Sequence, residues 1–508
     1  MSEERIRAVK LEKITRLREQ GVSPYPERFA RTHTLAEASR LDEGTEGVRA
    51  AGRIISRREF GKLTFFDLMD IEGRLQVSLQ QDEIGRESFR SFAKLVDIGD
   101  FVGVVGEIYR TRVGQITVKA GAWQLLGKTL HPLPEKYHAI ADGELRTRRR
   151  YLDLIMDGES RRRFLLRGRL VRSLRSHLDE SGFHEVDTPV LCTSPSGALA
   201  TPFVTHHNAL DMPLYLSIAP ETYLKRCIVA GYDRVYEFAR VFRNEGIDPS
   251  HLQDFTMLEY YVAYWNYIDN MSFTEELIRR TLAECLGSLR IEAGEESIDL
   301  GEDWARRAFG ELIDEHAGID IDKHPDAESL RAAIASRGIP LEGSGRGEID
   351  KLGRGSLVDL LYKKMCRPKL RQPTFVTDHP IELSPLARRR DGDAAIADRF
   401  QLVVRGWEIL NAYSELVDPI DQRRRLEEQA RLRAAGDEEA MPMDHDYLLA
   451  MEHGMPPISG WGMGIDRFAA LACGVENLRD VVLFPLMRPE EGMAAEESAH
   501  RPPGERAP

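Results

Sequence analysis

The sequence predicts an α+β protein with a small N-terminal β-barrel followed by a larger domain, in which helices flank an antiparallel β-sheet. Three observations support this fold class. The chain has 508 residues, which is long for a single hydrophobic core. Residues 48–126 show the alternation of short strands. A long helical pattern at 161–180 is followed by two strand-like runs at 235–243 and 256–264.

The composition is that of a soluble globular protein, with 42% hydrophobic and 30% charged residues. No window approaches the roughly 18 continuous apolar residues that span a membrane, and the N-terminus has no apolar signal-peptide core. We therefore expect a cytoplasmic protein without a membrane partner. A net charge of −13 argues against a protein coated in DNA or RNA, but it permits a local RNA contact.

The cysteines and histidines give no sign of a structural metal. The five cysteines are scattered and form no C-x-x-C pair, so we expect free thiols. His206 and His207 are adjacent, but no Cys/His cluster has zinc spacing. Zinc is not expected.

Residues 1–47 are predicted to form a helical extension. Apolar residues recur at helical spacing between residues 3 and 20, among several Arg and Lys side chains. The cationic face of this helix is either simply solvated or in weak contact with RNA.

Residues 48–130 are predicted to form a small barrel of the oligonucleotide-binding type. Glycine-containing turns separate about five strands, and a helix is expected near 83–95. Residues 131–150 are predicted to be a linker, because the two prolines of HPLPEK hold the chain extended.

Residues 151–489 are predicted to form the second domain. Its first long helix ends at Gly182 and leads into an extended segment, 183–189. Residues of about 286–370 are mostly helical in pattern, and we interpret them as an insertion. The tail, 490–508, is rich in Glu, Ala, Pro and Gly and is predicted to be disordered.

Two arginine-containing segments carry the chemistry. If the runs 235–243 and 256–264 pair as antiparallel strands, Arg243 and Glu259 would lie on the same face of the hairpin. A planar guanidinium suits the charge that builds up on an α-phosphate during adenylation. The second segment ends at Arg467, and its glycines would let the backbone approach a ligand closely.

The segments RVFRNEG (240–246) and GMGIDR (462–467) resemble the second and third signature motifs of class II aminoacyl-tRNA synthetases. The helix and strand at 161–189 resemble the first motif, which builds the dimer interface in that family. The resemblance implies a class II catalytic domain, ATP as substrate and a homodimer. It also implies an arginine on the α-phosphate, a glutamate on the adenine amino group, and adenine held between a phenylalanine and a second arginine. The implied catalytic residues are Arg243 and Arg467, and the implied ATP-binding residues are Arg243, Glu245, His251, Phe255, Glu408 and Arg467.

Across roughly residues 1–489 the chain is similar to lysyl-tRNA synthetases of subclass IIb, notably in THHNAL, APETYLKR, ELSPLA and NAYSEL. The lysine pocket implied by this resemblance consists of Gly197, Glu221, Glu259, Tyr261, Asn411, Tyr413 and Glu415. Three of these residues are carboxylates. Because a buried ammonium must be paired, such a pocket suits a cationic side chain.

The resemblance also implies an anticodon site in the barrel and lysine tRNA as partner. Arg58, Phe65 and Gln76 fall at the matching positions. An aromatic ring there can stack on a splayed base while polar groups bind its edge. Alternatively, Phe65 belongs to the barrel core.

The family uses Mg²⁺, up to three ions, held by two glutamates. Glu408 matches one of them, but the other position is Gln401. An amide can bind Mg²⁺ through its oxygen, but it lacks the negative charge of a carboxylate. The number of Mg²⁺ ions bound by this protein is therefore an open question. Further departures from the family pattern are Ser196, Thr201, Ile458 and, in the barrel, Gln115.

The implied activity is that of a lysine–tRNA ligase. Lysine would be activated by ATP to lysyl-adenylate and then transferred to the 3′ end of lysine tRNA. Catalysis would rest on positioning and charge stabilisation, without a protein nucleophile. The departures keep two alternatives open: a paralogue with altered amino-acid or tRNA specificity, and an inactive tRNA-binding or regulatory protein.

Overall fold

The computed structural model describes residues 3–134, 142–246, 248–340, 352–434 and 440–488. The chain divides into two compact units, Met1–Arg161 and Arg162–Pro508. Residues 135–141 of the predicted linker, 341–351 of the predicted insertion and the predicted disordered tail lie outside the described residues. In the part of the chain that is described, no helix is both long and apolar enough to cross a membrane.

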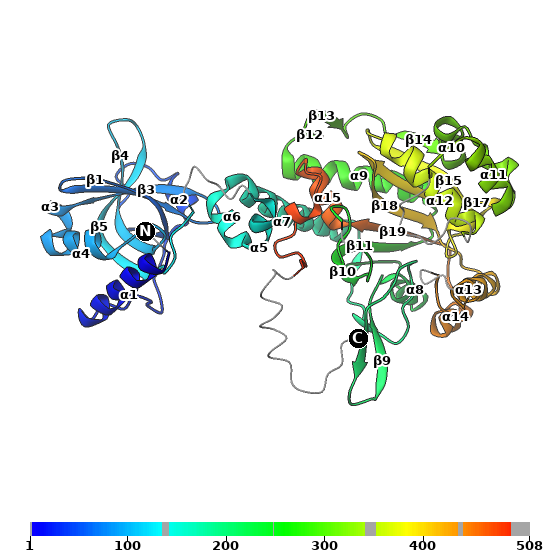
Figure 1. Cartoon of the computed structure of the whole chain (residues 1–508), viewed down its shortest axis with the longest axis horizontal. Helices are drawn as coiled ribbons and strands as arrows, with labels where there is room; N and C mark the ends of the chain where they lie inside the picture. Colours follow the sequence, from blue (N-terminus) through cyan, green and yellow to red (C-terminus); the bar gives the residue numbers. More distant parts are fainter. Residues whose placement is uncertain (1–2, 135–141, 247, 341–351, 435–439, 489–508) are drawn as a thin grey trace. The chain divides into compact units, whose positions relative to one another are not determined.

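The first unit contains the predicted barrel (Figure 1). The barrel closes in the strand order β1-β2-β3-β5-β4. Its strands are β1 (Val48–Phe60), β2 (Leu63–Met69), β3 (Arg74–Gln80), β4 (Phe101–Arg110) and β5 (Ile116–Gly127). Phe66, Val77 and Val104 lie in its core, as expected where alternate strand residues face inward. The predicted helix is present as α3 (Gln81–Ile84) and α4 (Arg86–Leu95).

The N-terminal segment contributes to the barrel core. It forms α1 (Glu3–Glu19) and α2 (Leu35–Ala38), and Leu17 and Leu35 are both fully buried in the barrel's hydrophobic cluster. A capping box starts α2: the Thr34 side chain accepts from the Glu37 backbone N–H, and the Glu37 carboxylate accepts from that of Thr34. Residues 3–47 therefore contribute to the barrel core, which the predicted separate extension did not anticipate.

The second unit is built, within its described residues, on a nine-stranded sheet in the order β14-β15-β17-β18-β19-β11-β10-β6, with β16 paired to β17. Its strand pairs are antiparallel except β14–β15 and β6–β10. The strands are β6 (His184–Glu185), β10 (Arg234–Phe242), β11 (Asp254–Ala263), β14 (Ala305–Ala308), β15 (Thr374–Pro380), β16 (Arg389–Arg390), β17 (Asp393–Val404), β18 (Trp407–Ser414) and β19 (Ile458–Gly464).

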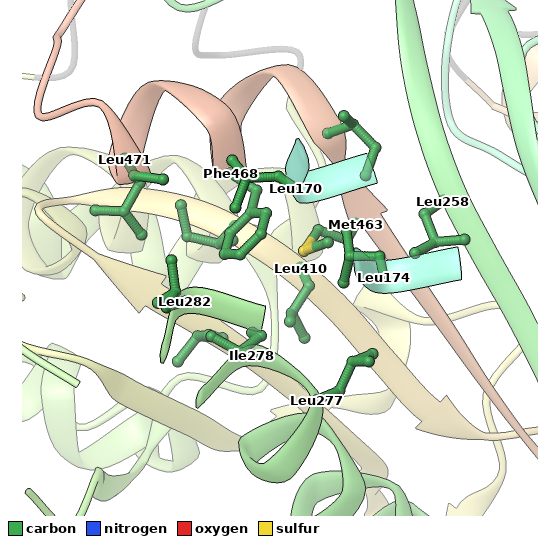
Figure 2. Close-up of a cluster of buried hydrophobic side chains, with 14 of the residues drawn as sticks. Leu170, Leu174, Leu258, Leu277, Ile278, Leu282, Leu410, Met463, Phe468 and Leu471 are labelled. Carbon is green, nitrogen blue, oxygen red and sulfur yellow. The ribbon is translucent and has the colours of Figure 1, made fainter. Parts of the chain in front are cut away.

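The two faces of this sheet have different roles. Leu258 on β11 pairs with Met463 on β19, which pairs with Leu410 on β18, and all three side chains are buried. They pack against α7 (Gly158–Glu180), α9 (Tyr267–Leu286) and α15 (Ile465–Ala472), as Figure 2 shows. Because strand side chains alternate, the neighbouring row of Glu259, Gly462 and Asn411 points to the opposite face. The face with these helices holds the main core. The opposite face is covered in part by α8, whose Leu224 and Ile228 cluster with Val235 and Tyr261.

The predicted hairpin is formed by β10 and β11, with Glu237 opposite Glu259 and Phe242 opposite Asp254. The remaining elements surround the sheet. They are α8 (Glu221–Val229), α13 (Pro419–Ala434), α14 (His445–Glu452) and a small sheet of β7 (Leu191–Cys192), β8 (Val204–His207) and β9 (Met212–Leu216). The first unit also contains α5 (Gly143–Arg148), a helix inside the predicted linker, and α6 (Arg150–Met156).

The segment interpreted as a helical insertion contains strands that the prediction missed. Helices α10 (Phe309–Ala317), α11 (Ala327–Ser336) and α12 (Arg354–Leu361) are accompanied by a hairpin of β12 (Arg290–Ala293) and β13 (Glu296–Asp299). In addition, β14 forms the edge of the main sheet beside β15. The sequence of β14, ARRA, has no apolar alternation, so only its pairing partner makes it a strand.

Candidate active site

A cavity of about 360 Å³ lies against the sheet face that carries Glu259, Gly462 and Asn411. This volume lies within the range of small-molecule sites. Its wall brings together residues from Gly197 to Leu478, which are far apart in the sequence. The predicted ATP-binding residues all line it: Arg243, Glu245, His251, Phe255, Glu408 and Arg467.

Arg243 stands at the end of β10, where the hairpin opens into the loop. Its guanidinium lies 5.2 Å from the centre of the Phe255 ring, and its Nη2 donates to the Ile218 carbonyl at 3.4 Å. Among the described residues its buried Nε has no hydrogen-bond partner. Burial lowers the pKa of Arg243, but a guanidinium stays charged in proteins. A charged group with an unused donor at a cavity wall is suited to binding an anion.

Arg467 is held in place from both sides of the cavity. Its Nη1 donates to the Glu408 carbonyl at 3.1 Å and its Nη2 to that of Ser250 at 3.4 Å. The preceding residue, Asp466, accepts from Arg167 Nη2 at 2.9 Å and from the Thr256 backbone N–H at 3.0 Å. Asp466 therefore ties the start of α15 to α7 and β11. Sequence reasoning missed this positioning residue, although an acidic residue in the first turn of a helix was a usable signal.

The opposite end of the cavity is acidic and aromatic. Of the seven residues predicted for the lysine pocket, six line the cavity: Gly197, Glu221, Glu259, Tyr261, Asn411 and Tyr413. The Tyr413 hydroxyl donates to Glu221 Oε1 at 2.7 Å, and the Tyr261 hydroxyl donates to Glu259 Oε2 at 3.3 Å. Burial, followed by repulsion from Glu221, raises the pKa of Glu259 well above its ordinary value. A cationic ligand would relieve this unfavourable charge.

The seventh residue, Glu415, is not among the residues that line the cavity. Its side chain is fully buried, and its Oε2 is 2.5 Å from the Nζ of Lys225. A Cβ atom added at Gly460 would lie 2.0 Å from Glu415 Oε1, so the carboxylate occupies space that any other residue at this position would fill. Sequence reasoning missed Lys225, although its spacing from Glu221 places both on one face of α8.

Gln401 and Glu408, the two positions implied to hold Mg²⁺, are in direct contact. The Gln401 amide donates from Nε2 to Glu408 Oε2 at 3.0 Å, and the buried Gln401 Oε1 has no hydrogen-bond partner within the described residues. Only Glu408 of the two lines the cavity. One carboxylate and one neutral amide oxygen fit a Mg²⁺ ion that takes most of its remaining ligands from phosphates and water.

The other departures lie outside the cavity wall as far as the described residues show. The Ser196 hydroxyl donates to Asp444 at 2.7 Å. The Thr201 carbonyl accepts from the Asn244 backbone N–H at 2.8 Å, and Ile458 is buried in β19. In the barrel, Gln115 is exposed, and its backbone N–H donates to the Thr111 hydroxyl at 3.1 Å.

The predicted anticodon residues share one outer face of the barrel. Arg58 on β1 is directly opposite Phe65 on β2, and Gln76 on β3 is opposite Asp67, two residues along from Phe65. Phe65 lies outside the barrel's core cluster, which takes in its neighbour Phe66 instead. Gln76 is almost buried and accepts from the Thr117 hydroxyl at 2.9 Å.

This face carries a second aromatic residue that sequence reasoning missed. The ring of Phe60 is 62% exposed and meets Phe65 edge-to-face, with 6.3 Å between the ring centres. An exposed phenylalanine at the end of a predicted strand was the available signal. Two aromatic rings beside an exposed arginine make a stacking surface for unpaired bases.

Comparison with known proteins matches both units. The family model described as "tRNA synthetases class II (D, K and N)" matches residues 142–488, and "OB-fold nucleic acid binding domain" matches 48–126. The lysine–tRNA ligase of Pelotomaculum thermopropionicum is 48% identical over 488 residues, 95% of either chain. That of Carboxydothermus hydrogenoformans is 45% identical, covering 95% of this chain and 98% of its own. That of Bacillus subtilis is 42% identical, covering 94% and 96%.

Proposed function

The chain belongs to the class II tRNA synthetases, among the lysine–tRNA ligases, and from this we propose that it joins L-lysine to the 3′ end of lysine tRNA at the expense of ATP. One observation carries the proposal. A single cavity has two partly buried arginines at one end and two glutamates, each bonded by a tyrosine, at the other. It therefore offers separate places for a phosphate chain and for a cationic amino acid.

In the first step, an oxygen of the lysine carboxylate attacks the α-phosphorus of ATP. The bond to the β-phosphate oxygen breaks, and pyrophosphate leaves. Negative charge builds up on the α-phosphate oxygens, and Arg243 is the residue that we propose stabilises it. Phe255 and Arg467 would hold adenine between a ring and a guanidinium, with Glu245 on its amino group and His251 beside the nucleotide.

Lysine would be recognised by its two ammonium groups. Glu221 and Glu259 supply carboxylates at the cavity wall, and Gly197, Asn411, Tyr261 and Tyr413 shape the space around them. In the second step, a ribose hydroxyl at the tRNA 3′ end attacks the lysyl carbonyl carbon, and AMP leaves. The protein supplies position and charge, and no covalent enzyme intermediate is formed.

Mg²⁺ would neutralise phosphate charge when bound, and Glu408 and Gln401 are the residues that would hold it. Replacing Gln401 by Glu restores a second anionic donor. We expect Gln401→Glu to lower the free Mg²⁺ needed for half-maximal exchange by about tenfold. Titration of Mn²⁺ in the presence of ATP, followed by its electron paramagnetic resonance signal, gives a readout independent of turnover. An unchanged Mn²⁺ affinity would contradict the assignment of Gln401.

Exchange of pyrophosphate into ATP, measured with each amino acid and with and without tRNA, tests the proposed function. Lysine-dependent exchange together with charging of lysine tRNA is the expected result. Exchange with another amino acid would instead identify a paralogue with altered specificity. Absence of exchange with every amino acid would leave a tRNA-binding or regulatory protein.

The barrel face tests the tRNA part of the proposal. Removing the Phe65 ring by Phe65→Ala should raise KM for lysine tRNA by about 10–100-fold, because a stacked base contributes about 1–3 kcal/mol. Exchange without tRNA should stay unchanged. Phe101→Ala, which removes a 41% exposed ring from β4 of the same barrel, is the control and should leave the KM for tRNA within about twofold. If Phe65→Ala and Phe101→Ala change the KM for tRNA equally, the assignment of Phe65 to the anticodon site is wrong.

We further propose that the protein is a homodimer, on the strength of the resemblance of residues 161–189 to the first class II motif. Sedimentation equilibrium should give twice the chain mass of 57.6 kDa. A mass of one chain across the concentration range would contradict the dimer.

A further inference from the structure

The ammonium of Lys225 is enclosed by the acidic end of the cavity. Its side chain has no exposed surface. Its Nζ donates to Glu221 Oε1 at 2.6 Å and pairs with Glu415 Oε2 at 2.5 Å. The rings of Tyr261, Tyr413 and Tyr447 surround it, with centres 5.6 to 5.8 Å from Nζ.

This ammonium is a permanent charge of the folded protein. Burial alone would lower the pKa of Lys225, but the attraction of Glu221 and Glu415 outweighs it and raises that pKa well above its ordinary value. The two carboxylates come from different places in the fold: Glu221 is on α8, and Glu415 directly follows β18. The two ion pairs of Lys225 therefore join these two segments.

The charges at this end of the cavity can be counted. Glu221, Glu259 and Glu415 bring three negative charges when ionised, and Lys225 neutralises one of them. These four side chains together leave two negative charges for a ligand. Arg399, which also lines the cavity, is bonded to neutral groups, Asn411 Oδ1 at 2.7 Å and Ser384 Oγ at 2.9 Å. Free lysine carries an α-ammonium and an ε-ammonium, while its carboxylate must face the phosphate end to react.

We propose that Lys225 is a built-in counter-ion that sets the charge of the amino-acid pocket, so that the pocket matches an amino acid with two ammonium groups. This rests on the proposed function. Lys225 acts on lysine binding by orienting Glu221. Its Nζ and the Tyr413 hydroxyl both donate to Glu221 Oε1. Lys225 is therefore a positioning residue that does not itself touch lysine.

The test removes the two buried charges singly and together. Lys225→Met keeps an unbranched apolar chain but leaves Glu221 and Glu415 to repel each other, so that one must take up a proton or move. We expect its KM for lysine to rise about 30-fold, with the KM for ATP within about threefold. Glu415→Gln alone should raise the lysine KM by about tenfold, because the remaining pocket charge is too small.

The double variant, Lys225→Met with Glu415→Gln, restores the charge balance. Its KM for lysine should return to within about fivefold of the wild type, a strong non-additivity that loss of packing cannot produce. The double variant also carries the test if Lys225→Met does not fold, because removing both members of a buried pair leaves no unpaired charge.

Lys128→Met in the barrel is the matched control. Lys128 is equally buried and pairs with Asp97 at 2.5 Å and Asp100 at 2.7 Å. Its loss should lower the melting temperature but leave the lysine KM unchanged. An unaltered lysine KM in Lys225→Met, or a folded double variant no better than the single one, would overturn the role of Lys225. If the wild type shows no lysine-dependent exchange, the proposed function fails first, and this inference fails with it.

Discussion

Arg243→Gln is expected to lower the rate of lysine-dependent ATP–pyrophosphate exchange by about 10³-fold, the cost of removing one preorganised group from a developing charge. The side chain is partly buried at the cavity wall, with a buried Nε, and the guanidinium stays charged. Glutamine keeps polar atoms there without the charge. Because the interaction strengthens as the carboxylate attacks, kcat should fall more than the KM for ATP rises.

Arg240→Gln is the control for this variant. Arg240 lies three residues earlier on β10, and its side chain is 42% exposed in an ion pair with Asp254. Exposed pairs contribute little to stability, so exchange should stay within about twofold of the wild type. A loss of only a few-fold in Arg243→Gln would mean that another group stabilises the α-phosphate.

Glu259→Gln is expected to raise the KM for lysine by about 100-fold and to leave the KM for ATP within about threefold, since a buried ammonium would lose its partner. Glu237→Gln is the matched control. Glu237 is the cross-strand neighbour of Glu259 and is 7% exposed, but it accepts from the Thr188 backbone N–H at 3.2 Å and lies outside the cavity wall. Its replacement should leave both KM values within about twofold.

The raised pKa of Glu259 gives this prediction a pH signature. At low pH the carboxyl holds its proton and cannot pair with an ammonium. As pH rises from the ordinary glutamate value of about 4.3 through the raised pKa, the carboxylate forms and the lysine KM should fall. The same proton favours the unliganded fold at low pH, so stability without lysine should decrease over that range.

Lysine should oppose this loss of stability, because it pairs with the carboxylate. Melting temperatures with and without lysine, measured across pH, check the sign. In Glu259→Gln the pH dependence of lysine binding should flatten. A wild-type lysine KM that rises with pH in this range would contradict the assignment.

Local patterns in the sequence were enough for the elements that carry the chemistry. Period-two alternation predicted the barrel strands, and two runs around a turn predicted the β10–β11 hairpin. The resemblance in short motifs identified the residues that meet at the cavity, from Gly197 to Arg467. The segment β14 was missed because its four residues become a strand only through pairing with β15.

By itself, the sequence determined the barrel, the hairpin with Arg243, and a set of acidic residues suited to a cation. Only the tertiary structure decided which carboxylates face the ligand. Glu221 and Glu259 line the cavity, whereas Glu415 is not among its lining residues and pairs with Lys225. The physical reason is that the charge of a pocket is a sum over side chains from several elements, and sequence spacing does not fix their distances in a buried site.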